Sequence, residues 1–128
     1  MTKQQALECK KWAVVGATDN KDKFGFKIYR KLKDHGYEVY PVNPGVTEVL
    51  GDKCYASLAE LPVKVEVVDF VVNEKIGLAV LQDMADLGIQ TAWLQPGADS
   101  KAVIAKAQEL GITPIQACVL VALGATDH

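Results

Sequence analysis

The chain has 128 residues, carries a net charge of -2 at pH 7 and is 49% hydrophobic by residue count. This length suits one domain with a single core, residues 1–128. The small net charge gives no reason to expect nucleic acid or an anionic membrane as a partner. No apolar run reaches the roughly 20 residues of a membrane span, and the N-terminal stretch MTKQQALECKKW contains no apolar signal segment.

Cysteine usage indicates the redox compartment. Cys9, Cys54 and Cys118 are odd in number, lie far apart and form no C-x-x-C pair. This spacing argues against a zinc site and against a disulfide framework. We therefore expect free thiols and a cytoplasmic protein.

Strand-like and helix-like patterns alternate along the chain. Apolar runs rich in β-branched residues predict strands at 12–15, 37–42, 65–72, 91–95 and 112–119. Apolar residues at three- and four-residue spacing predict helices at 24–35, at 74–87 and from residue 99 or 100 to 110. A glycine follows each helix, at Gly36, Gly88 and Gly111, as is common at helix ends.

This alternation predicts an α/β fold with a Rossmann-like, doubly wound parallel sheet of five strands in one domain. The expected strand order is 3-2-1-4-5, with the switch point between the first and fourth strands. Three loops then meet at the carboxyl edge of the sheet: 16–25, 43–45 and 95–98. Under this order, Asn73 after the third strand lies further out.

The loop after the first strand has features of a phosphate site. Gly16 allows the backbone to approach a ligand closely, and the amides of Ala17 and Thr18 can donate to a phosphate. The N-terminus of the following helix favours an anion, and Lys21 and Lys23 add positive charge. A phosphate-bearing ligand is the first hypothesis, and a plain strand-to-helix connection without a ligand is its alternative.

Two common nucleotide motifs are missing. An NAD site is expected to show G-x-G-x-x-G and an acidic residue at the end of the second strand. Here the next glycine after Gly16 is Gly25, and the second strand ends in Val42-Asn43-Pro44. The phosphate loop G-x-x-x-x-G-K-[ST] is also absent. These departures argue against a dinucleotide.

Four motifs in order carry a resemblance to a known family: VVGATDNKDKFGFKIYRKLKDHGYEVYPVNP, GDKCYASLAELP, VVDFVV and TAWLQPGA. They resemble the small stand-alone CoA-binding proteins and the CoA-binding domain at the N-terminus of the succinyl-CoA synthetase α-subunit. The similarity runs from about residue 12 to residue 118. It implies a Rossmann-like fold that binds coenzyme A, with the pyrophosphate at the first loop and the adenosine end near the second strand.

The resemblance also assigns residues of four loops to the ligand. Those at the pyrophosphate are Gly16, Ala17, Thr18, Lys23, Phe24 and Gly25. Those at the adenosine site are Val42, Asn43 and Pro44. Those that flank the nucleotide are Val72 and Asn73. Those on the pantetheine side are Gln95, Pro96 and Gly97. Two positions depart from the family pattern, since Gly45 replaces a frequent basic residue and Asn73-Glu74 stands where a proline is common.

No catalytic constellation is evident. His35 at a helix end and His128 at the last position lie away from the predicted cleft, so no general base is assigned. Cys118 is interpreted as a buried structural cysteine. We therefore expect a non-catalytic module that binds, senses or delivers CoA or an acyl-CoA.

Two alternatives remain open: a small NAD- or nucleotide-binding enzyme, and an interaction subunit that has lost its ligand. The apolar segment 117–123 is expected to extend the fifth strand and then to pack on the domain or on a partner, with a homodimer contact favoured.

Overall fold

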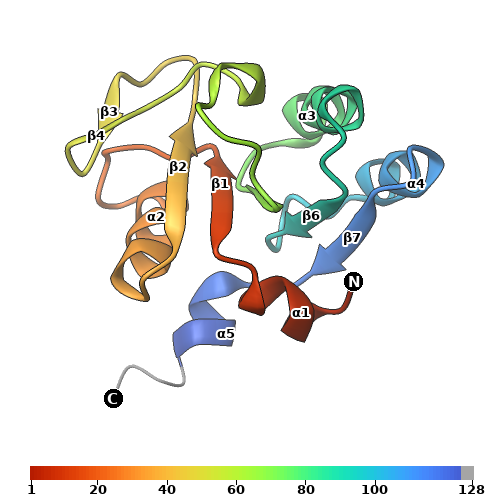
Figure 1. Ribbon diagram of the computed structural model, residues 1–128, viewed down its shortest axis with the longest axis horizontal. Coiled ribbons are helices and arrows are strands. Elements are labelled where there is room, and N and C mark those ends of the chain that lie inside the picture. Colours follow the sequence, from red (N-terminus) through yellow and green to blue (C-terminus); the bar gives the residue numbers. More distant parts are fainter. Residues whose placement is uncertain (125–128) are drawn as a thin grey trace.

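The computed structural model describes residues 1–124, which form a single parallel sheet with helices on both faces (Figure 1). The sheet contains β1 (Lys11–Val15), β2 (Glu38–Val42), β5 (Val67–Phe70), β6 (Thr91–Leu94) and β7 (Thr113–Gln116) in the order β2-β1-β5-β6-β7. A separate antiparallel hairpin pairs β3 (Glu48–Val49) with β4 (Asp52–Lys53). The helices are α1 (Lys3–Glu8), α2 (Phe24–Asp34), the 3-10 helix η1 (Leu58–Glu60), α3 (Glu74–Leu87), α4 (Lys101–Glu109) and α5 (Val119–Gly124).

The Rossmann-like class and the five parallel strands are confirmed, but the third strand lies elsewhere than expected. In chain order the sheet reads 2-1-3-4-5, because β5 pairs directly with β1 and not with β2. The connection that follows β2 passes through η1 and crosses the face opposite to α2. A right-handed crossover on the opposite face must step in the opposite direction, which places β5 on the other side of β1.

Alternating side chains of the strands feed two separate cores. Trp12, Val14 and Trp93 face α1, α2 and α5, and the rings of the two tryptophans lie 5.3 Å apart. Ala13 and Phe70 face η1, α3 and α4. Figure 1 shows α2 and α5 on one side of the sheet and α3 and α4 on the other. A strand covered on both faces is largely apolar, as β1 is after Lys11 and β6 is after Thr91.

The predicted helices are confirmed, and capping residues explain where α3 and α4 begin and where α3 ends. Asn73 caps α3 by accepting a hydrogen bond from the Ile76 N–H at 3.0 Å, and Gly88 ends it with a φ of 73°. Ser100 caps α4 in the same way, accepting from the Val103 N–H at 3.3 Å. These caps follow the usual preference for Asn and Ser at helix starts and Gly at helix ends.

The C-terminal segment differs from the expectation. The strand stops at Gln116, not at residue 119, and the apolar residues after Cys118 form α5. The buried Gln95 side chain accepts a hydrogen bond from the Val119 N–H at 3.0 Å, which turns the chain away from the sheet. Val119 and Leu123 pack on the α2 face, whereas Val121 is exposed. A homodimer contact through this segment stays a prediction.

Asp69 is a polar residue in the middle of the sheet. It is fully buried on β5, and neither carboxylate oxygen has a hydrogen-bond partner among the described residues. Burial raises the pKa of Asp69 well above its ordinary value. The folded protein therefore keeps this proton at a pH where the unfolded chain releases it.

This pKa shift makes stability depend on pH. A group whose pKa is raised by folding contributes stability below its unfolded pKa, and that stability is lost as the pH rises towards the folded value. Asp69→Asn cannot titrate, so the wild type should lose stability relative to this variant as the pH rises above about 4. Urea unfolding of both proteins from pH 4 to pH 8 measures the difference. A difference that stays constant over this range would contradict the assignment.

Candidate functional site

Three cavities adjoin along the carboxyl edge of the sheet. The β2-side cavity, of about 530 Å³, lies between the ends of β1 and β2 and the first turns of α3. The glycine cavity, of about 600 Å³, lies over the loop after β1. The β6-side cavity, of about 330 Å³, lies beyond the end of β6.

Shared walls join these cavities into one groove. Ile76 lines both the β2-side and the glycine cavity, and Asn73 lines both the β2-side and the β6-side cavity. Phe24, Val71 and Val72 line both the glycine and the β6-side cavity. Because β5 lies beside β1, the loop 71–73 forms the middle of the groove. The expectation that Asn73 lies further out is therefore wrong.

Most of the predicted site residues lie in this groove. The glycine cavity is lined by Gly16, Thr18, Lys23, Phe24, Gly25, Asn43 and Val72. The β2-side cavity is lined by Val42, Pro44 and Asn73. The β6-side cavity is lined by Gln95, Pro96 and Gly97. Ala17 differs, since its side chain is fully buried in the core on the α2 face.

Two glycines allow α2 to begin directly on the loop after β1. Gly16 has a φ of 99°, and a Cβ there would lie 2.2 Å from the Val71 carbonyl oxygen. A Cβ on Gly25 would lie 2.1 Å from the Gly16 carbonyl oxygen. Both contacts are with backbone, so neither position has room for a side chain.

The N-terminus of α2 is suited to an anion. Lys23 stands at the N-cap position and makes no side-chain cap bond to the helix, so the side chain leaves the first N–H groups to other partners. Such N–H groups, together with the helix dipole, favour phosphate. Lys23 lines the glycine cavity, whereas Lys21 lies with Arg30 on the outer side of α2, away from the groove.

Asn43 connects two of the loops. Its Nδ2 donates to the Ala17 carbonyl oxygen at 3.0 Å, and its Oδ1 accepts from the Gly45 N–H at 3.0 Å. Asp19 adds a second link, since its carboxylate accepts from the Leu50 N–H at 3.0 Å. These bonds hold the loop after β1 against the loop after β2.

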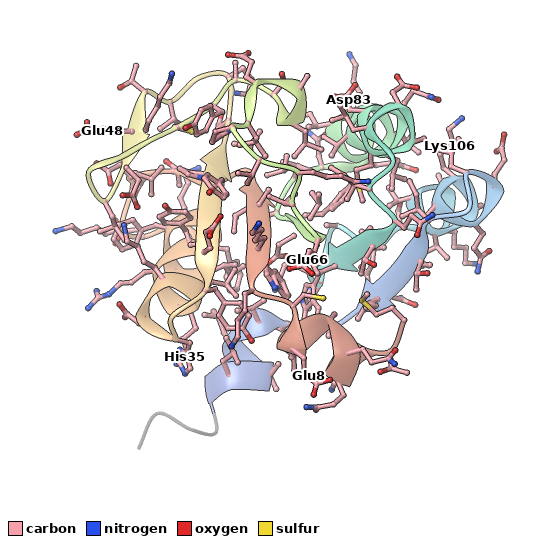
Figure 2. The ribbon with its side chains drawn as sticks, viewed as in Figure 1. Glu8, His35, Glu48, Glu66, Asp83 and Lys106 are labelled. Carbon is pink, nitrogen blue, oxygen red and sulfur yellow. The ribbon has the colours of Figure 1, made fainter. Side chains whose placement is uncertain are left out.

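Several residues of the groove were not predicted from the sequence. Lys75 and Asp83 on α3 line the β2-side cavity, and Ile28 on α2 lines the β6-side cavity. Figure 2 shows where Asp83 lies on α3. Ile28 belonged to the apolar helix pattern, which gives no sign that one end of the core opens into a cavity. The sequence offered one indication that Lys75 belongs to the site, since it lies in the first turn of a helix that follows a strand.

Cys118 also differs from the expectation. It is partly exposed and lines the β6-side cavity, so it is not a buried structural cysteine. All three cysteines are free, as predicted. His35 follows the last turn of α2, at the end of the helix remote from the groove (Figure 2).

No group of three or more His, Cys, Asp or Glu side chains within residues 1–124 is placed to hold a metal ion. No helix in the same range has the length and apolar character needed to cross a membrane.

The chain is similar to a protein family and to several solved structures. The CoA binding domain model matches residues 10–124. The uncharacterized protein YneT of Bacillus subtilis is 30% identical over 118 residues, which cover 91% of this chain and 87% of that protein. The acetate–CoA ligase (ADP-forming) II of Archaeoglobus fulgidus is 38% identical over 82 residues, which cover 62% of this chain and only 12% of the ligase.

Solved structures agree with this relationship. A hypothetical protein from Pyrococcus horikoshii OT3 superposes with a TM-score of 0.85 at 32% identity, covering 96% of this chain and 92% of that one. A conserved hypothetical protein from Pyrococcus furiosus has a TM-score of 0.84 at 39% identity, covering 88% and 98%. With the family match over residues 10–124, the chain belongs to the CoA-binding domain family.

Proposed function

We propose that this chain binds coenzyme A or an acyl-CoA along the groove and acts as a binding, sensing or delivery module without a reaction of its own. The observation that carries the proposal is the order of the three cavities. A mostly apolar cavity lies at each end, and the glycine cavity at the N-terminus of α2, suited to an anion, shares lining residues with both. CoA has the same order of chemistry, with adenosine, pyrophosphate and pantetheine in sequence.

Exposed apolar side chains support a ligand in the middle of the groove. Phe24 is 61% exposed and Ile76 is 46% exposed, and both line the glycine cavity. Exposed apolar surface that gathers around a groove is typical of a binding site. The methylene groups of pantetheine and the faces of adenine would cover such surface.

The groove suits CoA better than NAD. The carboxylates that line it, Asp22 and Asp83, come from the loop after β1 and from α3. A dinucleotide site holds its ribose hydroxyls with an acid at the end of the second strand, where this chain has Val42-Asn43-Pro44. The ribose of CoA carries a 3′-phosphate, which a carboxylate at that position would repel, so the missing acid agrees with the proposal.

The relatives support CoA as the ligand and leave the wider role open. The names of the Archaeoglobus and Pyrococcus ligases include acetate–CoA ligase activity, but this chain spans only 12% and 17% of their lengths. Ligase activity is therefore not transferred to it. A cytoplasmic location remains the expectation from the free thiols.

Calorimetric titration and thermal unfolding of the full chain with CoA, acetyl-CoA, dephospho-CoA and NAD test the proposal. A ligand at about one hundred times its Kd stabilises a protein by about 2.7 kcal/mol, which shifts Tm by several degrees in a domain of this size. We expect CoA to bind and NAD not to bind. Binding of NAD alone would support the nucleotide enzyme, and an empty groove at millimolar CoA would support the interaction subunit.

We further propose that Lys75 recognises the 3′-phosphate of CoA. Gly45 leaves the loop after β2 without the basic residue that the family often has there. Lys75 of α3 lines the same cavity as Val42 and Pro44 at the end of β2. An ammonium at this wall can pair with a phosphate on the ribose of a nucleoside bound there.

Lys75→Gln should weaken binding of CoA by roughly tenfold, the loss of one charged hydrogen bond. Binding of dephospho-CoA should be nearly unchanged. Lys106→Gln on α4, outside the groove (Figure 2), is the matched control. An equal loss for CoA and dephospho-CoA would show that Lys75 does not read the phosphate.

Gly25→Ala should damage the anion site itself. The added Cβ would meet the Gly16 carbonyl oxygen at 2.1 Å, so the first turn of α2 must move away from the loop. We expect a stability loss of about 1–3 kcal/mol, as for other overpacked positions, and a loss of CoA affinity. Gly45→Ala is the control, because its Cβ meets only the Asn43 Oδ1, at 3.7 Å. Urea unfolding and calorimetry measure both effects, and wild-type CoA affinity in Gly25→Ala would contradict this geometry.

A further inference from the structure

Cys118 lies where the groove ends. It follows β7 and lines the β6-side cavity together with Ile28 of α2 and Gln95 at the end of β6. In a ligand laid along the groove from the β2-side cavity, this end receives the group furthest from the nucleoside. For CoA that group is the thiol.

The other two cysteines differ from Cys118 in place and in chemistry. Cys54 is buried beside the hairpin, and Cys9 lies near the amino ends of the strands with Val65 and Thr91. Burial raises the pKa of each of these thiols, which disfavours the reactive thiolate. Neither lines the groove.

A second feature beneath the same cavity points to a ligand. Asp69 precedes Val71 by two positions, so both side chains lie on the α2 face of the sheet, and Val71 lines the cavity. The Asp69 carboxyl is fully buried, has no hydrogen-bond partner among the described residues and interacts electrostatically with Cys118. On the neighbouring strand the Nε1 of Trp93, the register partner of Asp69, is also buried without a partner.

Two unsatisfied polar groups side by side in a core are costly. Neither residue lines the cavity itself, but the Asp69 carboxyl lies near Cys118, on the face of the sheet from which Val71 reaches the cavity wall. Two neighbouring strands, β5 and β6, thus carry buried polar groups beside this cavity that no described residue satisfies.

We propose that Cys118 is a thiol-exchange site, at which the chain captures CoA as a mixed disulfide. This inference rests on the proposed function, because it needs the CoA thiol to lie in the β6-side cavity. The co-reactant is the disulfide of CoA. The chain would then distinguish oxidised from reduced CoA, holding the first by a covalent bond and the second by contacts alone.

The exchange is balanced without a further oxidant. The Cys118 thiol first releases its proton to water, and the thiolate attacks one sulfur of the CoA disulfide. A bond forms between Cys118 Sγ and that sulfur while the S–S bond of the disulfide breaks. The second CoA leaves with the electron pair as a thiolate and takes a proton from water. Excess thiol reverses the reaction by the same route.

Intact-mass spectrometry of the full chain, incubated with CoA disulfide, tests this inference. We expect one adduct that raises the mass of the chain by the mass of CoA less two hydrogens, removed by dithiothreitol and mapped to Cys118 by peptide analysis. Cys118→Ser should not form it, and Cys9→Ser should form it as the wild type does. Reaction should be at least about tenfold faster with CoA disulfide than with glutathione disulfide, since binding raises the local concentration of the reactant.

The outcomes separate this inference from CoA binding. If reduced CoA binds the wild type in calorimetry but no adduct forms at Cys118, the exchange site is wrong and the proposed function stands. Equal rates with both disulfides would likewise overturn the exchange site, since the reaction would be ordinary thiol reactivity. If reduced CoA does not bind at all, the proposed function fails and this inference fails with it.

Discussion

The first turn of α2 lies directly on the backbone of the loop that leaves β1, and the groove depends on this contact. It exists because Gly16 and Gly25 have no side chains, so two backbone segments can meet where a Cβ would lie only 2.1–2.2 Å from a carbonyl oxygen. The contact brings helix N–H groups to the edge of the sheet. Such N–H groups favour an anion without a set of charged side chains, and the proposed site is centred on them.

The path of the chain after β2 sets what surrounds that centre. The connection reaches the opposite face through η1, where Leu58 packs in the core with Val80 and Met84 of α3. A right-handed crossover on that face delivers β5 next to β1. The loop 71–73 therefore separates the two end cavities and lines both of them. The same step puts α3 beside the β2-side cavity, with Lys75 on its wall.

The face of the sheet under α2 contains both a well-packed aromatic core and buried polar groups without hydrogen-bond partners among the described residues. Trp12 and Trp93 lie in this core, but Asp69, in register between Val14 and Trp93, lacks a hydrogen-bond partner among the described residues. An apolar residue of similar size would avoid the desolvation penalty. Sites that bind ligands often keep such features at the expense of stability, and here the feature lies below the only cysteine that lines the groove within the described residues.

The amino-acid sequence by itself determined the elements and most of the loops of the site. Hydrophobic periodicity placed the strands and helices, glycines marked the helix ends, and the loop after β1 showed its phosphate-binding character. These features are local, so a single segment carries them. The alternation of strands and helices then placed three loops at the carboxyl edge, and the motif resemblance assigned residues of four loops to a ligand.

Tertiary structure decided which strands are neighbours and which side chains share a cavity. The order 3-2-1-4-5 was wrong because a strand pattern does not state which face the preceding connection crosses. Cys118 was misread as structural, and Lys75 was missed, because both join the groove through packing between distant segments. The end of β7 was also misplaced, since the hydrogen bond from the Val119 N–H to Gln95 turns the chain into α5. Apolar residues at 117–123 suit a strand or a helix equally well. The hydrogen bond from the Val119 N–H to Gln95, 24 residues earlier in the chain, favours the helix.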